Sequence, residues 1–477
     1  MNNLRILYVT SLRILLGFLI LGFFSCQKNL PDPGDFSESR SGPGNQTGIK
    51  MKNFIVISKS ETAPSGFESQ LSAYGEIIRS IPEIGVVVVR PTTSNFESKI
   101  SKLGDVQSVV PDLTARWIEP VKFVSEINPP SIGNNEPIFG LQWGMDAIDA
   151  PQAWNAGQKG EGARVFILDS GIDAEHPDLA PNLNTSLSTS FVPGEDFNVA
   201  AGFYFNHGTH VAGIIAAADN SFGVIGVAPE CEIVAVKVIS ETTGSGDFSW
   251  INAGIVYAAN NGADVINMSL GASVNRNGFY LDENNEVQKI PAVYIQDLIL
   301  AQQRAINYAF KKGAVIVSSA GNEMTDYDGS GSFIKLPAGL QNVIAVSSTA
   351  PDYWYKDLLN GVPEPFLDIP ASYTNFGKSL VDIAAPGGDF DFEDQMNWHW
   401  DMVISTISDG WGWAAGTSMA SPHVAGVAAL IVAKNAGKLS PAAVTKQLLN
   451  TADNIDGNGA SDYFGKGRVN AFRAVTE

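Results

Sequence analysis

Residues 163–173 read Ala-Arg-Val-Phe-Ile-Leu-Asp-Ser-Gly-Ile-Asp, an apolar run that ends on an aspartate and a glycine turn. Continuous apolar runs are typical of strands that are buried on both faces. Similar runs follow at 232–238, 263–268, 314–318 and 343–346. Segments with helical periodicity separate them, from near 207 and over 249–260, 302–310 and 418–434. The alternation predicts a three-layer α/β domain with a mainly parallel sheet and with sites at the carboxyl ends of its strands.

Three side chains at the ends of these elements form a candidate site for nucleophilic catalysis. Asp169 ends the first apolar run, His207 lies in Asn-His-Gly-Thr-His-Val-Ala-Gly (206–213), and Ser418 lies in Gly-Thr-Ser-Met-Ala-Ser-Pro-His (416–423) at a helix N-terminus. Each residue alone also fits a purely structural role: Asp169 in a turn, His207 in the core and Ser418 as a helix cap. Together they supply a nucleophile, a base and a group that orients the base.

The order of these residues in the chain separates two classes of hydrolase. Residues 416–420 nearly match the G-x-S-x-G elbow of α/β-hydrolases, but those enzymes place the histidine last. Here the order is Asp, His, Ser, which argues against an esterase of that class. His207 and His210 lack the His-Glu-x-x-His pattern of a zinc site.

The three segments resemble the signature blocks of the subtilisin-like serine proteases, or subtilases, and the resemblance covers roughly residues 140–475. It implies a serine endopeptidase with Ser418 as nucleophile, His207 as base and Asp169 as the orienting group. Residues 318–323, Ser-Ser-Ala-Gly-Asn-Glu, resemble the oxyanion-hole motif of the family, which implies Asn322 as a donor to the oxyanion.

The resemblance also implies a pocket for the substrate residue before the scissile bond. One wall is then formed by Ser269, Leu270 and Gly271, and the other by Ser319, Ala320 and Gly321. Because these wall residues are small, we expect a preference for large apolar side chains.

Residues 218–229 resemble the calcium-binding loop of the family. The implied ligands are the side chains of Asp178 and Asn220 and the carbonyl oxygens of Phe222 and Val224, since hard oxygen ligands suit Ca²⁺. Phe139 stands near the place of a further side-chain ligand, and a loop held by hydrogen bonds alone is the alternative. No organic cofactor is implied.

Short apolar and helical segments over residues 50–120 predict a small α+β unit of ferredoxin-like type. It resembles the inhibitor-type propeptides of subtilases, which implies an intramolecular inhibitor that is cut away; a permanent partner-binding domain is the alternative. The linker 121–139, which contains prolines, is expected to hold the maturation cut, and the peptidase domain is expected over 140–477.

Residues 1–26 carry basic residues, an apolar run and Ser25-Cys26, as in a lipoprotein-type signal peptide. Cys26 is the expected lipidation site, and residues 27–49 are expected to form a flexible tether. These features predict an exported protein that is lipid-anchored to a bacterial membrane and faces the periplasm or the cell surface. Ordinary secretion and an uncleaved anchor are the alternatives.

The formal net charge is -20, which argues against a nucleic-acid partner because such proteins show basic patches. Two cysteines, Cys26 and Cys231, cannot form a disulfide framework. The sequence therefore predicts an exported, autoprocessed serine endopeptidase that acts on proteins or peptides. A catalytically silent surface-binding protein with the same fold and a processing peptidase of narrow specificity are the alternatives.

Overall fold

The computed structural model describes residues 52–118, 123–126, 136–199, 206–282, 284, 286–329, 331–354, 366–390, 398–457 and 460–477. The predicted signal peptide with Cys26, the tether and most of the linker 121–139 lie outside the described residues. Within the described ranges, no helix combines the length and the apolar character that crossing a bilayer requires.

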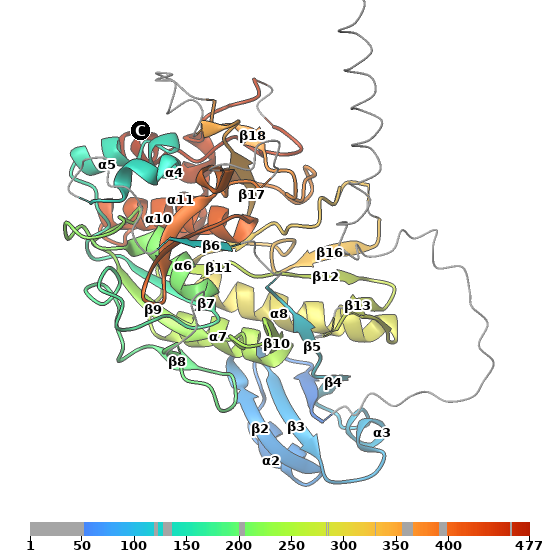
Figure 1. Cartoon of the computed structure of the whole chain (residues 1–477). Helices are drawn as coiled ribbons and strands as arrows, with labels where there is room; N and C mark the ends of the chain where they lie inside the picture. The colour runs from blue at the N-terminus through green and yellow to red at the C-terminus, as the bar shows by residue number, and fades with distance from the viewer. Residues whose placement is uncertain are drawn as a thin grey trace, which may run out of the picture. The chain divides into compact units, whose positions relative to one another are not determined.

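A twisted, mainly parallel sheet forms the centre of the peptidase domain (Figure 1). Its strand order is β18-β17-β15-β11-β7-β9-β8, with β19 beside β17, and only β18 runs antiparallel to its neighbour. The strands are β7 (Arg164–Asp169), β8 (Thr189–Ser190), β9 (Glu232–Lys237), β11 (Val265–Met268), β15 (Val315–Ser319), β17 (Ile344–Ala350), β18 (Ile369–Pro370) and β19 (Ile383–Pro386).

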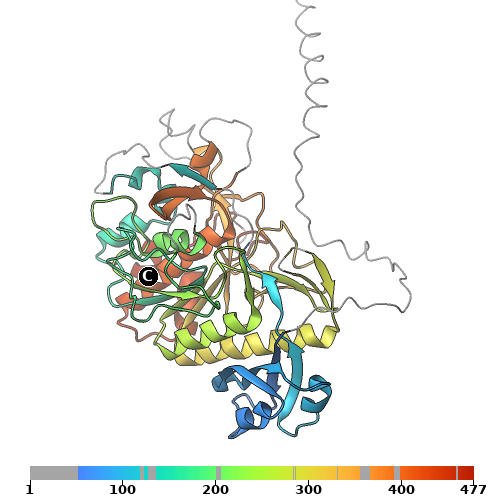
Figure 2. The ribbon, with the colours of Figure 1, turned by 60° about the horizontal axis from the view of Figure 1, so that its bottom comes forward.

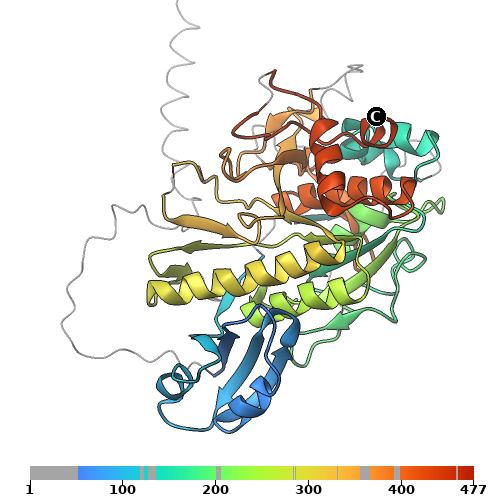
Figure 3. The same ribbon diagram turned by 180° about the vertical axis from the view of Figure 1, so that it is seen from behind.

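Helices cover both faces of this sheet, because successive strand side chains point to opposite sides. Phe166 and Leu168 of β7 pack in the same core as α7 and α8, whereas Val165 and Ile167 pack in the core of α6 and α10. Figure 3 shows α7 and α8 side by side across one face. The helices are α4 (Trp143–Ala147), α5 (Ala150–Asn155), α6 (His207–Ala216), α7 (Phe248–Asn260), α8 (Ala292–Lys312), α10 (Thr417–Lys434), α11 (Pro441–Asn450) and α12 (Ala471–Thr476). The predicted three-layer fold is therefore confirmed.

Three smaller sheets surround the central one and were not predicted from the sequence. β12 (Ala272–Asn275), β13 (Phe279–Leu281), β14 (Val287–Lys289) and β16 (Phe333–Leu336) form one of them. β20 (Val403–Ile407), β21 (Gly410–Ala414) and β6 (Phe123–Glu126) form the second, and β10 (Ser245–Asp247) pairs with β5 (Thr114–Arg116) in the third. Short 3₁₀ turns lie at Phe139–Leu141 (η2) and Trp398–Asp401 (η3).

The N-terminal unit is an antiparallel sheet of order β2-β3-β1-β4 with two helices, as the α+β prediction requires. Its elements are β1 (Phe54–Ser58), α2 (Phe67–Ser72), β2 (Gly75–Ile81), η1 (Pro82–Ile84), β3 (Val86–Pro91), α3 (Phe96–Ile100) and β4 (Val106–Pro111). The alternating residues Val87 and Val89 face α2 and α3, whereas Val86 and Val88 join the core of α7 and α8 (Figure 2). Strand β2 does not stand out as an apolar run in the sequence, because most of its residues are only half-buried.

Candidate active site

Asp169 and His207 are joined by a buried hydrogen bond at the carboxyl end of β7. Nδ1 of His207 lies 2.9 Å from Oδ1 and 3.0 Å from Oδ2 of Asp169, and both residues are buried. Asn206 caps the N-terminus of α6, because its side-chain oxygen accepts a hydrogen bond from the N–H of Thr209 at 2.8 Å. The cap therefore fixes His207 as the first residue of the helix, where it reaches the end of β7.

The other ring nitrogen of His207, Nε2, is buried and has no hydrogen-bond partner among the described residues. The proton on Nδ1 faces the carboxylate, so Nε2 is left as the basic nitrogen. Such an orphan acceptor in a buried site is unusual, because buried polar atoms are nearly always paired. His207 is therefore held by Nδ1, and its Nε2 is left to act on another group.

Ser418 is the second residue of α10, which packs against α6. Its Oγ donates to the carbonyl oxygen of Ser269 at 3.2 Å rather than to Nε2 of His207. Ser269 returns the contact, since its own Oγ donates to the carbonyl oxygen of Ser418 at 2.8 Å. The structure thus joins Asp169 with His207 directly, and it joins Ser418 with the predicted pocket wall.

Asn322 lies just beyond β15 and is held by the residue before Ser418. Its Oδ1 accepts from the N–H of Thr417 at 2.9 Å and from the hydroxyl of Thr417 at 2.7 Å. A Cβ atom built on Gly416 would lie 3.3 Å from Nδ2 of Asn322. The amide NH₂ group therefore faces the start of α10 as an available donor.

The two predicted pocket walls leave the sheet at the same edge, because β11 and β15 are parallel neighbours. The hydroxyls of Ser318 and Ser319 donate to the carbonyl oxygen of Leu270 at 3.3 and 3.5 Å. All six wall residues are buried, with Ser269, Leu270 and Gly271 on one side and Ser319, Ala320 and Gly321 on the other.

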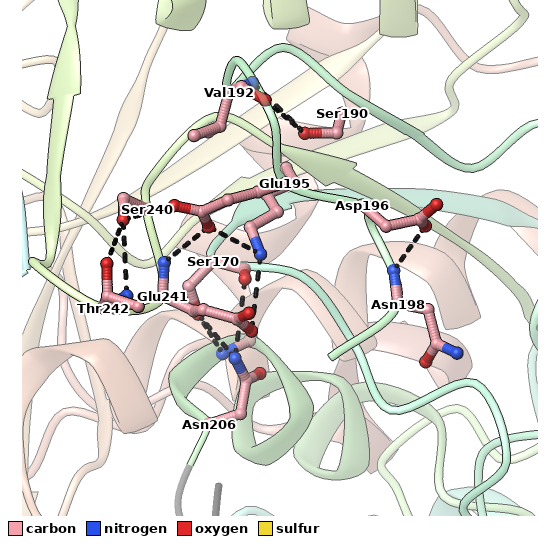
Figure 4. A network of polar contacts seen from close by, with 12 residues as sticks. Ser170, Ser190, Val192, Glu195, Asp196, Asn198, Asn206, Ser240, Glu241 and Thr242 are labelled. Carbon is pink, nitrogen blue, oxygen red and sulfur yellow. Dashed lines mark hydrogen bonds and ion pairs between the residues drawn. The ribbon is translucent and has the colours of Figure 1, made fainter. Parts of the chain in front are cut away.

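A buried lysine that sequence reasoning missed supports the Asp169 end of the site. Lys237 is opposite Asp169 in the pairing of β7 with β9, and its Nζ lies 2.9 Å from Oε2 of Glu195 and 3.4 Å from Glu241. Figure 4 shows Glu195 reaching Ser240, whose hydroxyl donates to Oε1 at 2.6 Å. The contacts tie the loop after β8 to the end of β9. The signal in the sequence was Lys237 itself, a charged residue within the otherwise apolar stretch at 233–238.

A second part of the same network connects β7 with α6. The hydroxyl of Ser170 accepts from Nδ2 of Asn206 at 3.2 Å and from the N–H of Gly208 at 3.2 Å, and the residues Ser170 and Asn206 are visible in Figure 4. This bridge fixes the strand end relative to the helix start. It therefore also fixes the geometry of Asp169 and His207.

The two other histidines near the site are buried and neutral. Burial lowers the pKa of His210 to about 3 and that of His423 to about 4. Nδ1 of His423 bonds the carbonyl oxygen of Met419 at 2.8 Å, and Nε2 of His210 bonds that of Gly412 at 3.0 Å. Neither contacts His207 by a hydrogen bond, and the described residues contain no cluster of three or more His, Cys, Asp or Glu that could hold a metal.

Two of the predicted calcium ligands, the side chains of Asp178 and Asn220, contact each other. Oδ2 of Asp178 accepts from the N–H of Val224 at 3.1 Å and from Nε1 of Trp411 at 2.8 Å, and Asn220 approaches Oδ1 at 3.4 Å. The pKa of Asp178 is raised to about 6, mainly by burial and also by the charge of Glu136, whereas the hydrogen bond from Trp411 acts to lower it. The carboxylate of Asp178 is a hard oxygen ligand of the kind that suits Ca²⁺, and the contacts of its oxygens are N–H donors.

Glu136 is the residue of this loop that the sequence analysis missed. Its Oε1 accepts from the N–H groups of Asn220 and Ser221 at 2.9 and 2.7 Å, and its Oε2 accepts from that of Phe222 at 2.7 Å. These bonds hold the loop backbone.

A mainly parallel sheet with an Asp–His pair at one strand end and a serine at a helix start defines a subtilisin-like arrangement. The chain belongs to the subtilase family (peptidase S8), whose family model matches residues 160–467. It is thus a serine endopeptidase that acts on proteins or peptides.

Known proteins agree with this assignment over most of the chain. Thermitase from Thermoactinomyces vulgaris is 37% identical over 347 residues, which cover 72% of this chain and 98% of thermitase. Subtilisin E from Bacillus subtilis is 36% identical over 336 residues, covering 70% of this chain and 71% of subtilisin E. The solved structure of the epidermin leader peptide processing serine protease from Staphylococcus aureus is similar with a TM-score of 0.71 at 23% identity, covering 89% of this chain and 97% of that one. That likeness shows the fold.

Proposed function

We propose that Ser418 attacks the peptide carbonyl, with His207 as the base that takes its proton and Asp169 as the group that orients His207. The observation that carries this proposal is the buried Asp169–His207 bond, which leaves Nε2 without a partner among the described residues. Rotation of the Ser418 hydroxyl away from Ser269 brings its proton toward Nε2. His207 then returns that proton to the leaving amine.

Attack of the Ser418 oxygen on the carbonyl carbon places a negative charge on the carbonyl oxygen, and this oxyanion needs donors that are already in place. Nδ2 of Asn322 supplies one, because Thr417 holds the other end of the amide. The backbone N–H of Ser418, at the start of α10, supplies the second, and the helix dipole favours the same charge.

A fluorophosphonate probe tests the proposed nucleophile. We expect labelling of the mature enzyme and none of Ser418→Ala, together with cleavage of unfolded casein. An unlabelled wild type would support the silent surface-binding protein instead. Labelling without casein cleavage would favour the processing peptidase of narrow specificity.

We also propose that the N-terminal unit inhibits the enzyme before maturation. β5, which follows this unit, pairs antiparallel with β10, and the carbonyl oxygen of Trp117 accepts from the N–H of Gly271 at 2.7 Å. Trp117 is buried against Phe248 at 4.8 Å between ring centroids, and its Nε1 donates to the carbonyl oxygen of Gly246 at 2.8 Å. A chain segment that adds as a strand beside a pocket wall is the mode in which proteases bind extended peptides.

Export, lipidation of Cys26 and binding of structural calcium by Asp178, Asn220 and the carbonyls of Phe222 and Val224 belong to the same proposal. The first two are supported by the sequence, and calcium also by the buried carboxylate of Asp178, which Asn220 contacts. Detergent-phase partitioning of the full chain and of Cys26→Ala tests the anchor: only the parent should enter the detergent phase. The expected preference for large apolar residues before the cut stays a prediction, and the charges of Lys335 and Glu323 beside the pocket walls argue against it.

A further inference from the structure

The side chain of Lys335 lies directly behind both predicted pocket walls. A Cβ atom built on Gly271 would lie 2.7 Å from Cε of Lys335, and one built on Gly321 would lie 2.6 Å from the same atom. These glycines are the third residues of the two walls. Any side chain at either position would collide with the lysine, so the lysine stem occupies the space where the walls converge.

The fold places Lys335 there through a strand pairing that the sequence did not reveal. Lys335 is opposite Ser273 in the antiparallel pair of β12 and β16, and β12 continues the wall that ends at Gly271. The residue is 2% exposed. A lysine is rarely buried to this extent unless its charge is compensated.

Glu323, the residue after Asn322, compensates that charge. Oε1 of Glu323 forms an ion pair with Nζ of Lys335 and accepts from the hydroxyl of Ser273 at 3.1 Å, while Oε2 accepts from Nδ2 of Asn375. Burial acts to raise the pKa of Glu323, but Lys335 holds it below its ordinary value. Lys335 and Glu323 are called the floor pair below.

The two members of the floor pair differ in their remaining hydrogen-bonding capacity. Both oxygens of Glu323 already accept bonds. Nζ of Lys335 has three N–H groups, and among the described residues it contacts only Glu323 and, at 3.4 Å, Ser273. An entering carboxylate therefore meets a spare N–H donor on Lys335.

We propose that Lys335 makes this enzyme prefer an acidic residue, glutamate above all, immediately before the scissile bond. The inference rests on the proposed function, since it takes Ser418 as the nucleophile and the two walls as the pocket. A glutamate carboxylate satisfies the spare N–H with a charge-assisted bond. A phenylalanine both lacks room beside the lysine stem and leaves the spare N–H of the buried ammonium without an acceptor.

The test is a set of peptides that differ only in the residue before the cut, with Glu, Gln, Ala, Leu, Phe and Lys compared. The readout is the ratio of kcat/KM for Glu to that for Phe within one preparation, which does not depend on how much enzyme is folded. We expect a ratio of at least about 10 for the wild type, the size of one charge-assisted bond to a buried group. A ratio below 1 in enzyme that the fluorophosphonate probe labels overturns the inference and leaves the proposed function standing. An enzyme that the probe does not label contradicts the proposed function itself.

A variant separates local recognition from net charge. Lys335→Met keeps the stem length and should lower the Glu-to-Phe ratio about 10- to 100-fold. Lys438→Met removes an exposed lysine with the same change in net charge and should keep the wild-type ratio. Equal ratios in Lys335→Met and wild type overturn the inference. If Lys335→Met fails to fold, the wild-type ratio alone decides.

Discussion

Asn322 uses the two ends of its amide for different tasks. Its oxygen accepts two bonds from Thr417, which immediately precedes the proposed nucleophile, and its NH₂ group is thereby aimed at the start of α10. This division means that the donor is positioned before any substrate arrives, which is what electrostatic stabilisation of an oxyanion requires.

Asn322→Asp keeps the acceptor for Thr417 but removes the donor. We expect kcat to fall by about 10²–10³, the loss that one such donor causes in subtilisin, with KM nearly unchanged. Steady-state kinetics on a peptide substrate measures both constants. Thr417→Val serves as a control for misplacement of the amide, and a large rise in KM with constant kcat in Asn322→Asp would contradict the oxyanion role.

Asp169 acts only through His207. Asp169→Asn places an NH₂ group against Nδ1 and favours the wrong tautomer, so we expect kcat to fall about 10⁴-fold near neutral pH. Fluorophosphonate labelling should slow in parallel, because it depends on the same base. Unchanged labelling by this variant would exclude the proposed orienting role.

At the scale of elements, the loop at 218–224 is stabilised from two sides. Glu136 holds three of its backbone N–H groups, while Asp178 lies beneath it with Asn220 and Trp411. These hydrogen bonds hold the loop backbone, and a bound cation would offset the burial of the Asp178 carboxylate.

Removal of calcium should therefore lower the thermal stability of the wild type. We expect the Tm to rise with added Ca²⁺ and to fall with chelator, since a ligand that binds only the folded state stabilises it. Asp178→Asn should show little difference between the two conditions. A wild-type Tm that is the same with added calcium and with chelator would contradict the calcium site.

The segment between β4 and β5 carries a carboxyl group that makes docking of the N-terminal unit depend on pH. Asp112 accepts from the N–H and the hydroxyl of Ser249 at 3.2 and 2.6 Å. Burial and the charge of Asp247 raise the pKa of Asp112 to about 7. A carboxyl whose pKa is raised in the docked state stabilises that state at low pH, and the stabilisation is lost as the pH rises from about 4 to about 7.

Urea unfolding of Ser418→Ala at pH 5 and pH 8 measures this effect without interference from cleavage. We expect the drop in midpoint between the two pH values to be smaller when Asp112→Asn is added. Equal drops in the two proteins would show that Asp112 does not titrate in this way.

At the scale of the whole molecule, the peptidase fold and the triad residues could be predicted because each lies in a continuous local pattern. The strand β7 and the turn after Asp169 are adjacent in sequence, and so are the residues that begin α6 and α10. The floor pair could not be predicted, since Lys335 meets Gly271 only through the pairing of β12 with β16. Glu136 was missed for the same reason, because its partners at residues 220–222 lie far away along the chain.

The N-terminal unit joins the peptidase domain through the core that it shares with α7 and α8 and through polar contacts. Arg304 of α8 donates to the carbonyl oxygens of Ser58 and Ser60 at 3.1 and 3.2 Å. Together with β5 beside β10, these contacts hold the segment that ends at Ile118 against the wall at Gly271. The proposed maturation therefore requires a cut after this segment.

Intact-mass analysis of residues 27–477, expressed as wild type and as Ser418→Ala, tests the central claim most directly. We expect the wild type to yield two fragments with a junction between residues 118 and 139, and Ser418→Ala to keep a single full-length mass. Two intact chains, or the same cut in both, would contradict the claim that Ser418 is the nucleophile of an autoprocessing protease.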